Sequence, residues 1–310
     1  MKRIKKIFLF HSNLNQLRII MQRSVLTFLL FYFSLIIIVS AQEDNMYVPR
    51  PIKISPASSE VGIFLGGSYY TGDLNPSGHF NRFTRPAAGG LYRMNFNSRF
   101  STKIIGSYGT IEANDAYSSN VGNHNRNLSF KSKIMELAVE GEFNFLPYSI
   151  GAKKSAISTP YIFSGVAVYH FNPKGYYQGR WYNLQPIGTE GQGSVFSNNK
   201  TYSLTQFAIP FGAGVKINIA KRIGINFEWG IRKTFTDYLD DVSGKYVDLV
   251  LLESEKGAVA AALSDKSLVI EGGSNAGRQR GNSFTKDWYA FAGVIITFKI
   301  NEKEGCDVPH

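Results

Sequence analysis

The sequence of 310 residues predicts an all-β fold, an eight-stranded antiparallel up-and-down transmembrane β-barrel with long extracellular loops. Three observations lead to this prediction. An apolar segment near the N-terminus has the order of parts found in a secretory signal, eight later stretches alternate between apolar and polar residues, and the connections between those stretches are short and long in turn. Together they favour a barrel that spans a membrane over a soluble β-sandwich.

Residues 1–41 have the features of a signal peptide. The run from Val25 to Ala41 is almost wholly apolar, follows basic residues, and ends in small residues that suit a cleavage point. We therefore predict a signal peptide that is removed. Two alternatives stay open: a retained membrane anchor, since the run approaches the length of a spanning helix, and a start at Met21, which would leave residues 1–20 untranslated.

The positive charge does not indicate a nucleic-acid partner. The chain has 34 Lys+Arg against 23 Asp+Glu, or +11, but residues 1–41 contain six basic residues and no acid. The remainder therefore carries 28 against 23, or +5, and its basic residues are dispersed rather than gathered on one element. The single cysteine, Cys306, excludes an internal disulfide and a thiolate-rich zinc site, and it leaves an intermolecular disulfide open.

Alternation with a period of two begins near residue 60. It is clearest over residues 222–235, where Phe227 and Trp229 share one face while Glu228 and Arg232 share the other. Each stretch has about the length that a tilted membrane strand needs. The eight predicted strands cover residues 61–70, 87–97, 99–109, 133–145, 159–171, 205–219, 222–235 and 287–300.

The polar faces of these strands carry whole charges. We predict that they form a network of four basic and four acidic groups that pair inside a narrow lumen. The alternative is a soluble sheet whose charges face water, which the signal peptide and the aromatic second face disfavour. The predicted lumen residues are Arg93, Lys103, Glu136, Glu140, Glu142, Lys216, Glu228 and Arg232.

The lengths of the connections predict which end of the barrel is which. Outer-membrane barrels have short periplasmic turns and long external loops, and eight strands with both termini in the periplasm need three turns and four loops. The sequence supplies short links after residues 97, 145 and 219. The long links cover 71–86, 110–132, 172–204 and 236–286.

This topology divides the chain into a periplasmic N-terminal segment (42–59), a barrel in the bacterial outer membrane (60–300) and a periplasmic tail (301–310). Eight strands enclose an interior just wide enough for side chains, so we expect no solute pore. Function should then lie in loops, turns or tails. The periplasmic candidates for docking a partner are 42–58, the turn 146–158 with Lys153-Lys154, and the tail.

The sequence contains no recognisable enzymatic or cofactor motif. His79, His124 and His170 fall in or near the long loops, without the spacing of a nucleophile or zinc motif, and we interpret them as solvent-exposed. We therefore predict no enzyme, no cofactor, no nucleic acid and no small-molecule substrate. A lipid-modifying or proteolytic barrel that uses these histidines is the least favoured hypothesis.

Three aspartates near the end of the seventh strand form a weak metal candidate. Asp237, Asp240 and Asp241 lie within five positions, and oxygen ligands at short spacing suit Ca²⁺. The run lacks the spacing of a calcium-binding loop. We therefore favour a turn in which the Asp side chains cap backbone N–H groups.

The last long connection has two recognisable parts. Residues Val247–Leu268 are rich in Ala and Leu, which predicts a short helix over the barrel mouth. Gly272-Gly273 and the glycines at 277 and 281 then predict a flexible linker to the final strand. We do not interpret them as a phosphate-binding loop, because no strand–helix context follows.

Six stretches, in this order, resemble the PorG-like outer-membrane β-barrels associated with the type IX secretion system. They are residues 66–75, 144–148, 159–163, 170–173, 236–243 and 286–289. The most specific stretch reads Thr-Asp-Tyr-Leu-Asp-Asp-Val-Ser. The motif residues are Gly72, Asp73, Leu74, Asp237, Tyr238, Asp240, Asp241, Asp287, Trp288 and Tyr289.

The resemblance implies a structural role. It suggests that the barrel is held by outer-membrane lipid and anchors a periplasmic secretion-ring protein and a lipoprotein, without enzymatic activity. The long N-terminal extension and the longer charged tail depart from the family pattern. The alternative is an adhesion or ligand-binding barrel that acts through its extracellular loops.

Overall fold

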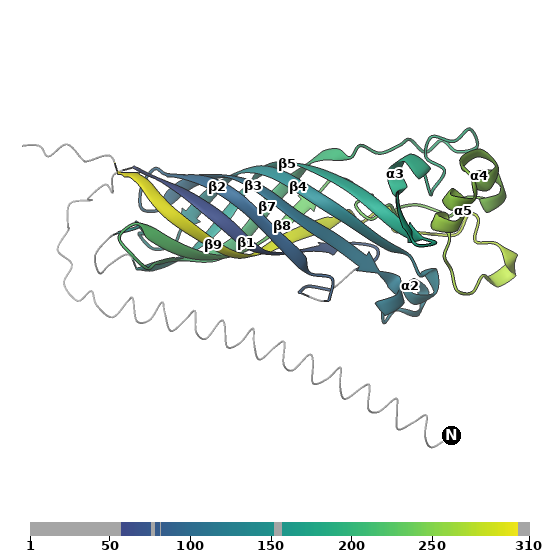
Figure 1. Ribbon diagram of the computed structural model, residues 1–310, viewed down its shortest axis with the longest axis horizontal. Coiled ribbons are helices and arrows are strands. Elements are labelled where there is room, and N and C mark those ends of the chain that lie inside the picture. The colour runs from purple at the N-terminus through teal and green to yellow at the C-terminus, as the bar shows by residue number, and fades with distance from the viewer. Residues whose placement is uncertain (1–56, 76–77, 81, 152–156, 303–310) are drawn as a thin grey trace, which may run out of the picture. The chain divides into compact units, whose positions relative to one another are not determined.

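A computed structural model describes residues 57–75, 78–80, 82–151 and 157–302 (Figure 1). The predicted signal peptide, most of the N-terminal segment, Lys153-Lys154 and the tail from residue 303 with Cys306 lie outside the described residues. The side chains of residues 301 and 302 are likewise outside the description.

Within these residues, eight long strands close into an antiparallel barrel. Each pairs with its neighbour along the chain, and the first pairs with the last, so the sheet has no free edge around its wall. The predicted fold class is thereby confirmed. The barrel strands are β1 (Ser58–Thr71), β2 (Arg85–Asn95), β3 (Phe100–Asn114), β4 (Ser129–Asn144), β5 (Ser158–Tyr177), β7 (Thr205–Asn218), β8 (Ile223–Thr234) and β9 (Trp288–Glu302). The short β6 (Arg180–Asn183) forms a hairpin with the end of β5.

The alternation in the sequence matches the two faces of the wall. On β4, Glu136 and Glu140 are buried, while Leu137 is 61% and Val139 is 45% exposed. Successive side chains of a strand point to opposite faces, so the charged set lies inside the barrel and the apolar set outside. A soluble protein buries the opposite set.

Three strands are longer than predicted at the end that carries the long loops. β3 continues to Asn114, β4 already begins at Ser129, and β5 continues to Tyr177. The predicted loops 110–132 and 172–204 are therefore partly strand, and their predicted bounds are wrong. Outward residues of these extensions are polar, as with Glu112 and Lys131. The alternation of apolar and polar residues therefore ended in the sequence before the hydrogen-bonded strands ended.

The long loops carry short helices at one end of the barrel (Figure 1). The predicted helix within Val247–Leu268 is present as two pieces, α4 and α5, and Asp248 caps α4 by accepting from the N–H groups of Val250 and Leu251. The helical segments are η1 (Asp115–Tyr117), α2 (Val121–Arg126), α3 (Leu184–Ile187), α4 (Leu249–Lys256), α5 (Ala258–Ser264) and η2 (Glu271–Gly273). None of the helices in the described ranges has the length and apolar character needed to cross a membrane.

The glycine-rich segment before β9 is not the linker we predicted. Its backbone forms a bridge between Lys245 and Gln279, and Arg280 is 3% exposed. Gly281 lies against Asp73, where a Cβ atom would collide with the carboxylate. Close packing, and not flexibility, therefore explains a glycine at this position.

Candidate functional site

The eight predicted lumen charges lie inside the barrel and pair with one another. Glu142 is the centre of the set, because Arg93 approaches it to 2.8 Å and Lys216 to 2.6 Å. Lys103 lies 2.6 Å from Glu228 and 2.9 Å from Glu140. The Lys216–Glu142 and Lys103–Glu228 contacts are charge-assisted hydrogen bonds, and the other two are ion pairs.

A second group of pairs lies nearer the loop end. Arg232 donates to both carboxylate oxygens of Glu136, at 3.1 Å from each, and approaches Glu140 at 3.7 Å. The Tyr289 hydroxyl donates to Glu136 over 2.6 Å. Tyr289 belongs to the predicted family motif, so the motif reaches into the lumen network.

Sequence reasoning missed one member of this network. Glu60 is 1% exposed and its carboxylate lies 2.8 Å from Arg93. Among the described residues, five lumen carboxylates thus face four cations, instead of the equal numbers predicted. The signal was present, since Glu60 continues the inward set of β1 by one step, but the predicted strand began at residue 61.

Aromatic rings fill the space that the charges leave. The ammonium group of Lys103 lies 4.7 Å from the centre of the Phe163 ring, and that of Lys216 lies 4.6 Å from Tyr161. The guanidinium of Arg232 lies 4.8 Å from the Phe291 ring. Cations over ring faces at these distances are attracted to them, and the rings and charges together occlude the lumen.

Three of the family-motif stretches meet at the mouth of the barrel. The Tyr70 hydroxyl lies 2.6 Å from the Asp240 carboxylate and 2.8 Å from that of Asp287, while the N–H of Leu239 donates to Asp287 over 2.9 Å. Three stretches that are far apart in the chain are therefore joined in one hydrogen-bonded group. We call this group, with Gly72, the mouth triad site.

Gly72 is required by this arrangement. A Cβ atom at residue 72 would collide with both the Asp287 carboxylate and the Tyr70 hydroxyl. The next residue, Asp73, accepts a hydrogen bond from the N–H of Asn282 over 2.8 Å, and Leu74 is buried. The Gly-Asp-Leu motif thus fits the first loop against the last one.

The two carboxyl groups at the mouth do not both ionise readily. Burial raises the pKa of Asp287 well above its ordinary value, and the neighbouring charge of Asp240 raises it further. Burial likewise raises the pKa of Asp240, with a further contribution from Asp73. The single Tyr70 hydroxyl proton can be donated to only one of the two carboxyl groups at a time.

A buried arginine holds the last loop to the third loop. Arg280 lies 3.0 Å from Glu190 and donates to the carbonyl oxygens of Asp241 and Ser264 over 2.6 and 2.9 Å. Glu190 also accepts from the N–H of Ser243 over 2.9 Å. Neither Arg280 nor Glu190 was predicted, because a buried arginine in a loop has no periodic signal.

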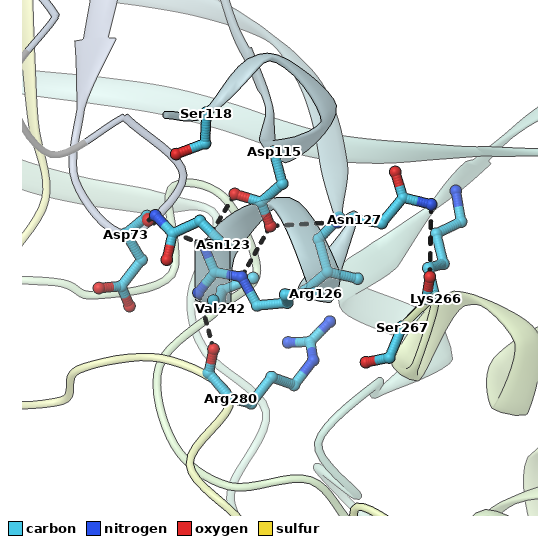
Figure 2. A network of polar contacts seen from close by, with 12 residues as sticks. Asp73, Asp115, Ser118, Asn123, Arg126, Asn127, Val242, Lys266, Ser267 and Arg280 are labelled. Carbon is cyan, nitrogen blue, oxygen red and sulfur yellow. Dashed lines mark hydrogen bonds and ion pairs between the residues drawn. The ribbon is translucent and has the colours of Figure 1, made fainter. Parts of the chain in front are cut away.

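We call the long loops at the mouth of the barrel, together with their short helices, the loop cap. Figure 2 shows a second arginine of the loop cap, Arg126, facing Asp115. Its guanidinium donates to the two carboxylate oxygens of Asp115 over 2.7 and 3.0 Å. It also donates to the carbonyl oxygens of Asp73 and Arg280, each over 2.8 Å. Arg126 therefore joins the second loop to the first and the fourth.

The aspartates of the weak metal candidate have separate roles. Asp240 accepts from the N–H of Val242 over 2.9 Å, which is the capped turn that we favoured. Asp241 accepts from the hydroxyl groups of Thr189 and Tyr202. No group of three metal-ligating side chains occurs in the part of the chain that the structure describes.

The remaining predicted motif residues and histidines are dispersed. Trp288 is half-buried on the outer wall, with its ring centre 6.1 Å from Phe211, and Tyr238 stacks on Tyr202 at 4.7 Å. The three loop histidines have different neighbours and do not meet: His79 contacts the Tyr69 hydroxyl, His124 lies in α2, and His170 contacts the Thr205 hydroxyl.

A cleft lies among the long loops at the mouth of the barrel. It has a volume of about 700 Å³ and opens between the first, second and fourth loops. Its lining is polar and basic, with Arg126, Arg278, Arg280 and Lys286 among its residues. Arg126 and Arg280 are already occupied by the contacts described above.

The opposite end of the barrel is closed by the turn after β4. Tyr148 and Ile150 are 5% and 2% exposed, and Lys299 donates to the carbonyl oxygen of Ile150 over 3.1 Å. Of the predicted docking turn 146–158, residues 152–156 lie outside the description. Its described first half folds under the barrel and leaves Pro147 exposed.

Several solved outer-membrane proteins are similar to this chain. The attachment invasion locus protein Ail of Yersinia pestis, solved with the heparin analogue sucrose octasulfate, is 11% identical with a TM-score of 0.35, covering 79% of this chain and 99% of Ail. Neisserial surface protein A is 7% identical with a TM-score of 0.39, covering 79% and 99%. A major outer membrane protein of Thermus thermophilus is 9% identical with a TM-score of 0.37, covering 78% and 100%.

The fold assignment above rests on the strand pairing of this chain and not on these similarities. No curated protein matches the chain. A family model does match: residues 46–254, more than half of the chain, fit the family described as Domain of unknown function (DUF6089). The chain therefore belongs to the DUF6089 family.

Proposed function

We propose that this protein is a structural barrel of the bacterial outer membrane that carries no pore and anchors periplasmic partners. The observation that carries the membrane location is that the barrel wall has apolar side chains on its outer face and charged side chains on its inner face. Along β4 and the residue that follows it, the outward residues are apolar or glycine from Met135 to Phe145. Ten residue steps of about 3.3 Å, tilted by about 40°, span about 25 Å, which is the height of the apolar band of such barrels.

The absence of a pore follows from the occluded lumen. Glu142, Lys103 and Arg93 are at most 2% exposed inside the barrel, and separating these paired ions to open a channel would be costly. We expect the purified protein to give no steady conductance in planar lipid bilayers. Stable open channels in the wild type would contradict this part of the proposal.

The partner is proposed from the resemblance to PorG-like barrels. The motif stretches that carry this resemblance are joined to one another by hydrogen bonds in the mouth triad site. Joined loops make the barrel more rigid, and a rigid body is suited to anchoring. We propose that the periplasmic segments hold a secretion-ring protein and a lipoprotein of a type IX machine. The protein then acts without catalysis.

Mild-detergent co-purification from outer membranes tests this partner. We expect the tagged wild type to recover ring protein and lipoprotein, and a variant lacking residues 303–310, or one with the 152–156 segment replaced by Gly-Ser, to lose them. A matched control shortens the external segment 195–199, which should leave recovery unchanged. Equal recovery by all the variants would contradict periplasmic anchoring.

One observation favours a second function. Four apolar side chains in the loops are strongly exposed: Val121 at 84%, Val195 at 96%, Val250 at 77% and Phe284 at 94%. Exposed loop positions are where such a barrel would contact another surface. If the loops bind, replacing these four residues by Ser should abolish attachment of intact cells without changing the co-purified partners.

A further inference from the structure

We propose that the outer wall of β3, β4 and β5 binds the phosphate groups of a phosphorylated outer-leaflet lipid, just beyond the apolar band. The site is a patch of Lys131, Lys133 and Lys174, which we call the lysine patch. The inference rests on the proposed membrane location, with the long loops outside. It concerns a ligand and does not depend on the periplasmic partner.

The strand register places the three lysines side by side. Lys131 lies directly opposite Lys174 in the β4–β5 ladder, and Lys133 follows Lys131 by two residues on the same outward face. Like charges that face each other across a strand pair are destabilising. An anion between them would reverse that cost.

The lysine patch is not neutralised by the protein. Within the described ranges, none of the three ammonium groups has a carboxylate at ion-pair distance. Glu112, which lies opposite Lys131 in the β3–β4 ladder, pairs with Arg85 instead. The ammonium group of Lys133 lies 6.0 Å from the centre of the Tyr108 ring, which is the outer limit for a cation–π attraction.

The height of the lysine patch matches the headgroup layer. The next row toward the membrane is Met135 with His170 and Tyr108, and Met135 is the first residue of the apolar band on β4. Lys133 and Lys131 lie two and four residues beyond Met135, about 7 and 13 Å along the strand, which at a tilt of about 40° is about 5 and 10 Å along the membrane normal. The headgroup layer on each side of a bilayer is about 5–8 Å thick, and the long lysine stems reach along the wall.

The surface beside the lysines suits a lipid and not only an ion. A cavity of about 530 Å³ is lined by the three lysines together with Met135, Tyr108 and Trp181. Trp181, on the β6 hairpin, is half exposed and packs against Tyr176 with ring centres 5.2 Å apart. Charged groups above an apolar and aromatic floor fit a phosphate that is attached to a sugar and acyl chains.

Native mass spectrometry of the detergent-solubilised full-length protein tests the proposal. The wild type is titrated with diphosphorylated lipid A and with the same lipid after removal of its phosphates. We expect the phosphorylated form to be retained preferentially, and the triple variant Lys131→Gln, Lys133→Gln, Lys174→Gln to lose about 100-fold in affinity for it. The charge-matched control is Lys200→Gln, Lys221→Gln, Lys245→Gln, which changes three exposed lysines elsewhere and should bind as the wild type does.

Equal binding of phosphorylated and dephosphorylated lipid by the wild type would overturn the proposal, as would unchanged binding by the triple variant. Heat-dependent mobility on gels verifies that each variant is a folded barrel, and insertion into phosphatidylcholine vesicles tests the membrane location separately. Insertion without phosphate preference would overturn the lysine patch alone, whereas failure to insert would overturn the proposed function.

Discussion

Replacing Glu142 by Gln removes the charge at the centre of the lumen network with almost no change in volume. Arg93 keeps a partner, because Glu60 lies 2.8 Å away. Lys103 keeps Glu140 and Glu228. Lys216 keeps none, since Glu142 is its only ion-pair partner among the described residues.

The expected cost is that of one uncompensated buried cation. Lys216 is fully buried and would retain no anionic partner, only a neutral amide oxygen at position 142 and the Tyr161 ring, 4.6 Å from its ammonium group. Breaking a buried ion pair by removing one partner costs about 3–5 kcal/mol. We therefore expect Glu142→Gln to lower the free energy of unfolding by that amount, measured by urea titration in lipid vesicles with tryptophan fluorescence.

Two controls make this test specific. Glu253→Gln, on the exposed face of α4, should change the free energy by less than about 0.5 kcal/mol. The double variant Glu142→Gln, Lys216→Met removes the orphaned cation and should recover at least half of the loss, because apolar replacements of buried ion pairs are well tolerated. A Glu142→Gln protein as stable as the wild type would refute the reasoning.

Three further predictions concern the loop cap. Gly72→Ala should open the cap, because its Cβ collides with Asp287 and Tyr70, and proteinase K should cleave the loops faster; Gly90→Ala, with open space around its Cβ, is the control. Arg126→Gln should weaken the cap by about 3 kcal/mol through the loss of the Asp115 pair, measured by the same proteolysis, with exposed Arg180→Gln unchanged. Burial raises the pKa of Asp237 to about 7 and that of Asp241 to about 6, whereas an unfolded carboxyl titrates near about 4. The closed cap therefore binds protons more tightly than the open one, and its stability should fall as pH rises from about 4 to about 7. Loop cleavage, normalised to an unstructured substrate, should be faster at pH 8 than at pH 5, and Asp237→Asn should reduce this difference; an unchanged pH dependence would contradict the assignment.

The wall of the barrel could be predicted because its signal is local. A period of two assigns each residue to a face without reference to any other strand, so Glu136 and Leu137 were placed correctly from the sequence alone. The same signal failed where its contrast faded. Glu112 and Lys131 are outward residues above the apolar band, and their polarity concealed two strand extensions.

The cap could not be predicted because its contacts are long-range and often involve the backbone. Arg126 reaches the carbonyl oxygen of Asp73, 53 residues away, and Arg280 reaches Glu190, 90 residues away. A backbone carbonyl leaves no mark in the sequence, and loop residues follow no period. The motif stretches could be identified, but that Tyr70 joins Asp240 to Asp287 follows only from the closed barrel.

The central claim is that the apolar face of the wall meets lipid. The most direct test is a nitroxide label at Leu137→Cys, in a Cys306→Ser background, in protein reconstituted into lipid vesicles. Its relaxation by oxygen, which concentrates in lipid, is compared with that by a water-soluble nickel complex. We predict strong relaxation by oxygen and little by nickel at this position, and the reverse for a label at the exposed loop position Val250→Cys. Strong nickel accessibility at Leu137→Cys would contradict the account.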